Sequence, residues 1–219
     1  MRKILWLTLL GSTLLLQSCF EIVEQLFLKN DGSGNLQLVI NMSKSKTKLN
    51  AIMKMKTVNG HKVPDKNEVT QQVAAIEQKI RGTAGISNVN TSLDFENYIA
   101  TLTCDFINVS CLNAGIKNIA QKQRRKQEIA NVYEYNGARK TFSRLNKFLI
   151  KNEYEEMSNA DKEIFATAMY TGIFKFEREI TSASNKDGRI SANKKAVMVK
   201  LNALDVINNK KTIENKIQL

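Results

Sequence analysis

The sequence predicts an α+β fold, built from antiparallel β-hairpins and sheet packed with a few α-helices. Alternating apolar and polar residues run through 21–28 and 35–42, on either side of a polar turn with two glycines, which is typical of a hairpin. Apolar residues at helical spacing mark other segments, most clearly Val69, Val73, Ile76 and Ile80. Because strands and helices do not alternate regularly, we expect a mainly antiparallel sheet within a single domain, residues 20–219.

The first half of this domain continues with elements that local signals define. A helix is expected within 43–56, followed by a polar loop at 57–67 that holds the only proline and the only histidine. The amphipathic helix from Val69 to Ile80 should end at Gly82. Strands are expected at 86–95 and 98–106, and then a short helix capped by Asn108 or Ser110.

The second half repeats this mixture of hairpins and helices. Asn136 and Gly137, between 132–135 and 141–144, predict a hairpin with a type I′ turn. Ser158 followed by Asp161 resembles a capping box that opens a helix, and Gly172 should end that helix. Three further strands are expected, at 173–180, 195–201 and 212–219.

The start of the chain has the layout of a secretory signal, with Arg2 and Lys3 before an apolar run at 4–16. The run of about 13 residues spans roughly 20 Å as a helix, which is too short for the ~30 Å hydrocarbon core of a bilayer. We therefore expect residues 1–18 to be a cleaved lipoprotein signal peptide that belongs to no fold.

The signal ends in Leu16, Gln17, Ser18 and Cys19, which resembles a lipobox. The resemblance implies that the chain is cut before Cys19 and that this cysteine carries lipid, with palmitate among its acyl chains. Ordinary secretion with a chance cysteine is the alternative. Two or more acyl chains anchor a protein stably, and the first strand begins almost at once, so we expect the domain to lie against the membrane.

Basic residues exceed acidic ones by 33 to 21, and the formal net charge of +12 falls to +10 without Arg2 and Lys3. Abundant Lys and Asn throughout, as an AT-rich genome would produce, explain this excess without a function. The alternative is attraction to anionic head groups. The possible contacts with head groups are a dense cluster, Lys122, Arg124, Arg125 and Lys126, and a second cluster, Lys44, Lys46 and Lys48. The alternative interpretation of both clusters is a solvated helix face.

Two cysteines remain in the domain, Cys104 and Cys111. A disulfide is possible in an oxidising compartment, and it would stabilise the fold by about 2.5 kcal/mol through loop entropy. A buried free thiol explains Cys104 equally well, because it shares a strand face with Leu102 and Phe106.

The sequence shows no catalytic constellation. His61 is the only histidine, which excludes triads and histidine-rich metal sites that need a second one within the chain. Glu153, Glu155 and Glu156 are interpreted as a solvated helix end, and the turn at 31–34 lacks the ligands of a calcium loop. We expect no enzyme activity, no cofactor and no metal.

Four short motifs together resemble a known group of proteins: Asp31 to Gly34, Ile86 to Val89, Ser184 to Lys186 and Ile190 to Ala192. The series resembles uncharacterised periplasmic lipoproteins common in the Bacteroidetes and, more distantly, LppM-like lipoproteins. It covers most of residues 20–219 and implies an α+β lipoprotein. Because LppM-like proteins are linked with the bacterial envelope and lipid binding, the resemblance also implies lipid as a candidate partner.

Two functions follow as hypotheses. The first is a membrane-anchored envelope lipoprotein that binds lipid or anionic head groups. The second is a structural or adaptor protein that docks an envelope protein complex through an exposed sheet edge, such as the strand at 212–219. We expect no nucleic acid partner. Only two separated acids, Glu21 and Glu24, follow Cys19, so we favour the outer membrane, facing the periplasm.

Overall fold

A computed structural model of the chain describes residues 20–120, 130–145 and 151–219. Its largest element is a seven-stranded sheet in the order β11-β12-β9-β1-β2-β6-β5. The strands are β1 (Glu21–Leu28), β2 (Gly34–Asn41), β5 (Ile86–Asp94), β6 (Ile99–Phe106), β9 (Met169–Phe176), β11 (Gly188–Ile190) and β12 (Ala196–Asn202). Neighbouring strands are antiparallel except β1 and β9, which run parallel. The predicted α+β class, with mainly antiparallel pairing, is confirmed.

A second sheet of four strands has the order β10-β13-β8-β7. Its strands are β7 (Tyr133–Asn136), β8 (Thr141–Arg144), β10 (Ser182–Ala183) and β13 (Asn215–Gln218). A two-stranded hairpin, β3 (Thr57–Val58) and β4 (His61–Lys62), lies within the segment expected as a loop.

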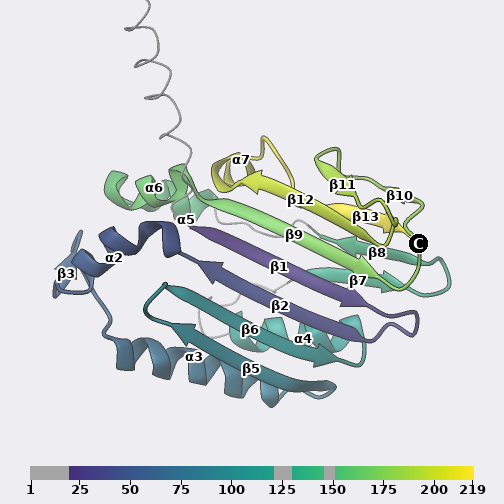
Figure 1. Cartoon of the computed structure of the whole chain (residues 1–219), viewed down its shortest axis with the longest axis horizontal. Helices are drawn as coiled ribbons and strands as arrows, with labels where there is room; N and C mark the ends of the chain where they lie inside the picture. Colours follow the sequence, from purple (N-terminus) through teal and green to yellow (C-terminus); the bar gives the residue numbers. More distant parts are fainter. Residues whose placement is uncertain (1–19, 121–129, 146–150) are drawn as a thin grey trace, which may run out of the picture.

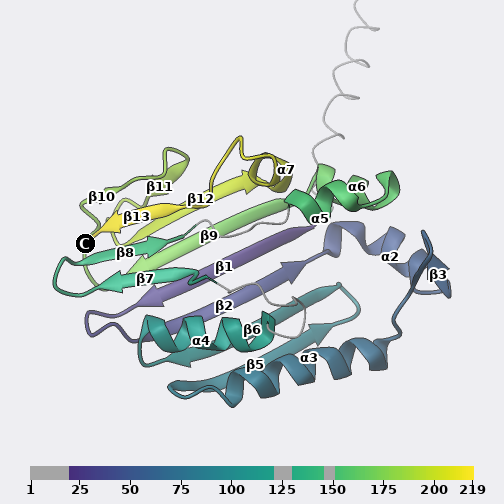
Figure 2. The same ribbon diagram turned by 180° about the vertical axis from the view of Figure 1, so that it is seen from behind.

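The helices gather in two places. The longer ones, α3 (Lys66–Arg81) and α4 (Val109–Ala120), lie behind β5 and β6, and the small sheet lies behind β1, β9 and β12 (Figures 1 and 2). Shorter helices gather near the end where β1 and β9 begin: α2 (Lys46–Ile52), preceded by the turn η2 (Ser43–Ser45), α5 (Lys151–Glu156), α6 (Asn159–Ala166) and α7 (Ala203–Ile207). One face of the large sheet is thus covered, and the other faces the viewer in Figure 1.

The main core lies between the large sheet and the layer behind it. Alternation places Leu26 and Leu28 of β1 on the covered face, where they are at most 1% exposed. The ring of Phe142 from β8 packs against Phe174 and Phe176 of β9, with centroids 5.6 and 5.5 Å apart. This contact between aromatic side chains joins the two sheets.

The two longer helices begin at capping side chains, and α3 begins at Lys66, within the segment expected as a loop. Asp65 caps α3, because its side chain accepts from the Glu68 amide while the Glu68 side chain accepts from the Asp65 amide. Asn108 rather than Ser110 caps α4, since the Asn108 Oδ1 accepts from the Cys111 amide at 2.9 Å.

Two glycine predictions are wrong. Gly137 does not form a two-residue type I′ turn, because Asn136 pairs with Thr141 and four residues connect them. Within this connection, the Arg139 amide donates to the Asn136 Oδ1. Gly172 does not end a helix. It lies inside β9, which begins at Met169, so the strand starts four residues earlier than expected.

Candidate functional site

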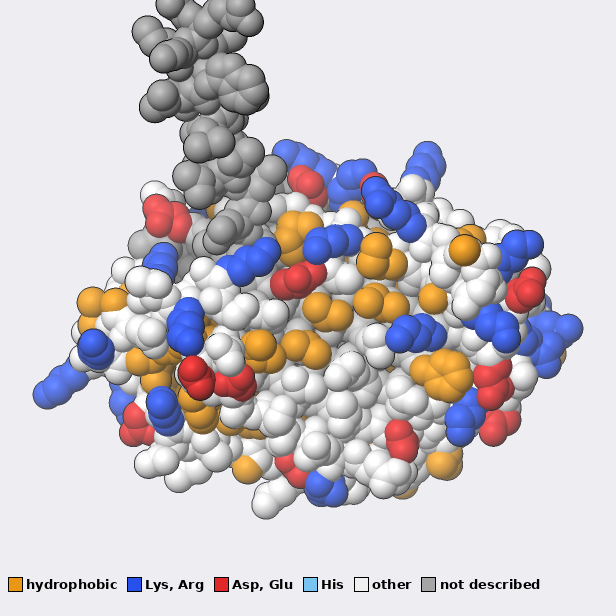
Figure 3. All heavy atoms as spheres, viewed as in Figure 1, with side chains coloured by type: hydrophobic (Ala, Val, Ile, Leu, Met, Phe, Trp, Pro, Cys, Tyr) orange, Lys and Arg blue, Asp and Glu red, His pale blue; other side chains and the backbone are white. Residues whose placement is uncertain are grey.

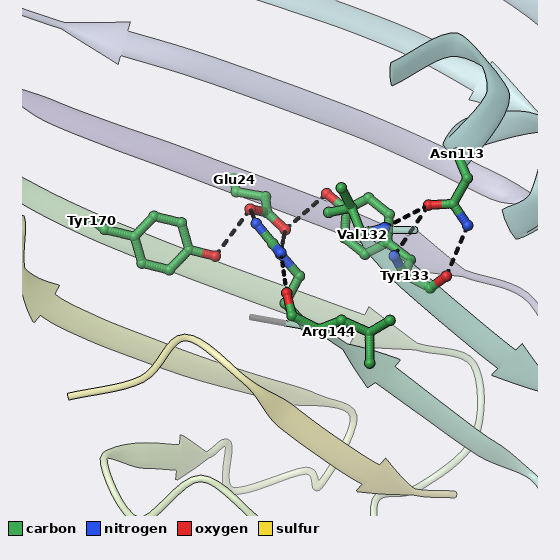
Figure 4. Close-up of polar contacts among 7 residues, drawn as sticks. Glu24, Asn113, Val132, Tyr133, Arg144 and Tyr170 are labelled. Carbon is green, nitrogen blue, oxygen red and sulfur yellow. Dashed lines mark hydrogen bonds and ion pairs between the residues drawn. The ribbon is translucent and has the colours of Figure 1, made fainter. Parts of the chain in front are cut away.

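A buried ion pair joins the two sheets (Figure 4). Glu24 points from the middle of β1 toward the small sheet, and Arg144 reaches it from the end of β8. The Arg144 Nε and Nη2 atoms lie 2.7 and 2.9 Å from the Glu24 Oε1 and Oε2 atoms, which makes the contact bidentate. The two side chains are 1% and 6% exposed. Each charge therefore depends on the other for its partner, because an unpaired charge at this depth is strongly unfavourable.

Two tyrosines complete the bonding of this carboxylate. The hydroxyl of Tyr133 donates to Glu24 Oε1 at 2.8 Å, and that of Tyr170 donates to Oε2 at 3.0 Å. Gly172 lies directly beside Glu24 in the parallel pair, and a Cβ there would be 2.7 Å from the Tyr170 hydroxyl oxygen. A glycine at this position therefore leaves room for the tyrosine to reach the carboxylate.

Asn113 of α4 fixes Tyr133 from the other side. Its Oδ1 accepts from the amides of Val132 and Tyr133 at 3.0 and 3.1 Å, and its Nδ2 donates to the Tyr133 carbonyl at 2.8 Å. The side chain thus pairs with the backbone of β7, the outermost strand of the small sheet, as another strand would. Helix, small sheet and large sheet are tied together through these contacts.

The protonation states follow from this environment. Burial, and then the nearby Glu24 carboxylate, raise the pKa of both Tyr133 and Tyr170 well above the usual value. For Arg144, burial is the largest effect and acts to lower the pKa, but the Glu24 carboxylate and the two tyrosines together outweigh it, and the pKa lies above its usual value. Near neutral pH the tyrosines are neutral donors and the arginine is charged.

An apolar cavity of about 260 Å³ extends from this cluster toward the end of the sheet where β1 begins. We call Phe20, Ile40 and Phe165 its mouth, because Ile40 is 37% exposed and the two rings are half-buried. Its deep end is formed by Glu24, Tyr170 and Ile213, which are 4%, 9% and 2% exposed. The cavity is larger than the ~150 Å³ apolar cavity that accepts benzene.

Aromatic side chains surround the mouth. The ring of Phe165 on α6 meets that of Phe20 edge-on at 6.1 Å and that of Tyr154 on α5 at 5.6 Å. The Lys162 Nζ lies 5.6 Å from the Tyr154 ring centroid and donates to the Glu155 carbonyl at 2.9 Å. A cation thus lies one ring away from the apolar mouth, an arrangement suited to an amphiphile.

The open face of the large sheet has a different character. Figure 3 shows apolar side chains across it and several Lys and Arg side chains around them. The strand register places Val23, Val39, Ile173 and Met198 on this face. Near Met198 a shallow groove is lined by Lys186, Arg189 and Lys200 among others, so this face is basic at that border.

Several predicted site residues lie outside the described residues. These are the signal peptide at 1–18, the lipidated Cys19, and the head-group cluster Lys122, Arg124, Arg125 and Lys126. Their roles stay predictions. Within the second cluster, Lys44 and Lys48 are exposed, and the Lys46 Nζ lies 3.8 Å from a Glu96 carboxylate oxygen.

The possible disulfide is not formed, because Cys104 and Cys111 are both free thiols. Cys104 points into the core from β6 and is 2% exposed, and burial raises the pKa of its thiol to about 11. Cys111 lies on α4 against Gly85, where an added Cβ would be only 2.4 Å from the Cys111 Sγ. The alternative of a buried free thiol describes Cys104.

The C-terminal strand is not an exposed edge, so the docking surface proposed for it is wrong. β13 pairs with β8 on one side and β10 on the other, and its Ile217 is 0% exposed. Its alternating apolar residues are buried in the core instead of being available to a partner.

Comparisons with known proteins show a distant likeness in structure. No family model and no curated protein matches the chain. Among solved structures, the chain is similar to the NMR structure of the folded domain of the LppM protein of Mycobacterium tuberculosis. The TM-score is 0.44 at 10% identity, over 94% of this chain and 92% of that one. The likeness is weak, so membership of the Bacteroidetes lipoproteins stays a prediction.

Within the described ranges, no helix is both long and apolar enough to cross a bilayer. Among the same residues, no three His, Cys, Asp or Glu side chains are grouped closely enough to hold a metal ion.

The sequence reasoning missed the Glu24 cluster and the cavity. A signal for Glu24 was present, because it shares the strand face of Leu26 and Leu28 and so occupies a core position of an alternating strand. An ionisable residue at such a position requires a partner. Nothing local indicated that the partner would be Arg144, 120 residues away.

Proposed function

We propose that the protein is a lipoprotein of the bacterial envelope, anchored through Cys19, that binds lipid and performs no enzymatic reaction. The observation that carries the proposal is the apolar cavity between the start of β1, α6 and α7. Among the described residues, those that line it are apolar apart from Glu24 and Tyr170, whose polar groups bond to each other. Such a cavity favours hydrocarbon, since burying each methylene group is worth about 0.8 kcal/mol.

The position of the cavity in the chain also supports the proposal. Phe20, at its mouth, directly follows Cys19 in the sequence. A lipid attached to Cys19 would hold the mouth within a few ångströms of a membrane, because consecutive Cα atoms are about 3.8 Å apart. We place the anchor at the outer membrane, facing the periplasm, where anionic lipid is a candidate ligand.

The test uses the chain from Phe20 onward, which carries all the described strands and helices, secreted without a lipidation site. Native mass spectrometry after detergent-free purification should show a stoichiometric lipid. Ile40→Asp, which places a charge at the mouth, should remove it. Val39→Asp is the matched control, because it adds the same charge on the opposite face of β2.

Two results would overturn the proposal. One is an unmodified chain that carries no lipid and also fails to take up a fluorescent fatty acid. The other is equal loss of lipid in both variants, which would place the lipid elsewhere.

A further inference from the structure

The two ends of the cavity differ in what they offer a ligand. At the deep end, the Glu24 carboxylate accepts four hydrogen bonds, two from Arg144 and one each from Tyr133 and Tyr170. The Tyr170 hydroxyl gives its only proton to this carboxylate. A ligand atom at this end therefore meets a fully bonded cluster.

An anionic head group would be unstable at the deep end. It would be desolvated beside a carboxylate whose own donors are already used, and both desolvation and like charge oppose that arrangement. A terminal methyl group loses nothing there, and it gains contact with Ile213 and Ile207, which are 2% and 5% exposed. The deep end therefore selects hydrocarbon.

The mouth has the opposite properties. Ile40 is 37% exposed, so a polar group beside it remains in contact with water. Lys162 lies against the ring of Tyr154, which itself packs edge-on against the Phe165 ring of the mouth, and it uses one of its three ammonium donors on the Glu155 carbonyl. The remaining donors suit a carboxylate or phosphate oxygen.

The volume limits how much of a ligand enters. An apolar cavity of ~150 Å³ takes the six carbons of benzene. By the same scaling, this cavity of about 260 Å³ has room for about ten carbons. That is the distal part of one acyl chain.

We propose that the cavity takes a single acyl chain with its methyl end inward, and that the chain belongs to a lipid whose anionic head group stays at the mouth beside Lys162. This rests on the proposed lipid binding and adds the ligand class and its orientation. A fatty acid and a lysophospholipid share this chemistry, since each combines one chain with one anionic head.

The experiment is methyl NMR on residues 20–219 with ¹³C-labelled isoleucine δ1 methyl groups. The probes are stearic acid with a doxyl spin label at carbon 5 or carbon 16. If the methyl end of the acyl chain lies inward, the carbon-16 label should broaden the methyl signals of Ile213 and Ile207. The carbon-5 label should then broaden the methyl signal of Ile40. Ile107 and Ile190, 62% and 42% exposed, are controls for non-specific contact.

The outcomes separate the two levels of the proposal. Reversed broadening, with the carbon-5 label acting on Ile213, would overturn the orientation and leave lipid binding intact. Broadening at neither end, or equally at the exposed controls, would overturn lipid binding in the cavity and the orientation with it.

The head group is tested by titrating stearic acid and, separately, palmitoyl lysophosphatidylglycerol. Lys162→Gln should weaken both about fivefold at low salt, as expected for one cation near an anionic group. Lys29→Gln makes the same charge change at the other end of β1 and should leave affinity unchanged. A loss for only one ligand identifies the head group that contacts Lys162, whereas no loss for either removes Lys162 from the site.

Discussion

The Glu24–Arg144 pair predicts a large and specific loss of stability. Replacing Arg144 by Met removes the two hydrogen bonds to Glu24 and the hydrogen bond from Nη1 to the Leu145 carbonyl. It leaves the buried Glu24 carboxylate without a cation. Breaking a buried pair on one side typically costs about 3–5 kcal/mol. At about 2–4 °C per kcal/mol for a chain of this size, the melting temperature should fall by roughly 10 °C.

The double variant Glu24→Leu with Arg144→Met separates pairing from packing. Removing both charges together leaves no buried ion, so the double variant should be more stable than Arg144→Met alone. It should remain below the unmodified chain, because the hydroxyls of Tyr133 and Tyr170 then lose their acceptor. Urea unfolding followed by circular dichroism measures the free energies of unfolding of the unmodified chain, of Arg144→Met, of Glu24→Leu and of the double variant.

The reasoning is refuted if Arg144→Met costs less than about 1 kcal/mol, or if the double variant is destabilised by the full sum of the single changes. Either result would mean that the two charges do not depend on each other in the folded chain.

Three further predictions concern separate features. Because the pKa of Tyr170 is raised on folding, the contribution of this tyrosine to stability should be constant up to about pH 10 and then fall as pH rises, by about 1.4 kcal/mol per pH unit. In urea titrations, Tyr170→Phe should make the fall of stability above pH 10 less steep. In protein secreted into an oxidising compartment, Cys104 and Cys111 should both react with a thiol reagent after denaturation, and Cys104 should be protected in the native state. An intact mass lower by two hydrogens, as a disulfide would give, would contradict this. Gly34→Ala should lower the free energy of unfolding by about 3 kcal/mol or more, because its Cβ would lie 2.0 Å from a backbone oxygen. Gly60→Ala should lower it by only about 1 kcal/mol, because that site has open space and only a φ of +81° opposes the side chain. Similar losses for the two variants would refute the argument.

Local patterns were sufficient to predict most elements of the fold. The alternation at 21–28 and 35–42 corresponds to β1 and β2, and the predicted capping residue Asn108 stands where α4 begins. These features depend on neighbours within a few residues, so a sequence reading can find them.

The arrangement of those elements was not predictable in the same way. That β13 lies inside the small sheet depends on pairing with Thr141–Arg144, and the start of β9 at Met169 depends on pairing with β1. The cavity is formed by side chains from distant segments, such as Ile22, Phe165 and Ile213. The periodicity of one segment contains no information about its contacts with segments that are distant in the sequence.

The parallel pairing of β1 with β9 has a consequence for the order of folding. Among the described strands, β1 is synthesised first, and its Glu21 lies beside Met169 of β9. One edge of this central strand therefore stays unpaired until most of the chain has been synthesised. Contacts so distant in sequence slow folding, because the loop must close before the strand pairs. Until then the β1–β2 hairpin presents an unpaired edge, the kind of surface on which chains associate with each other. Fragments that end before Met169 should therefore aggregate, and the intact chain should depend on protection of this edge while it is being made.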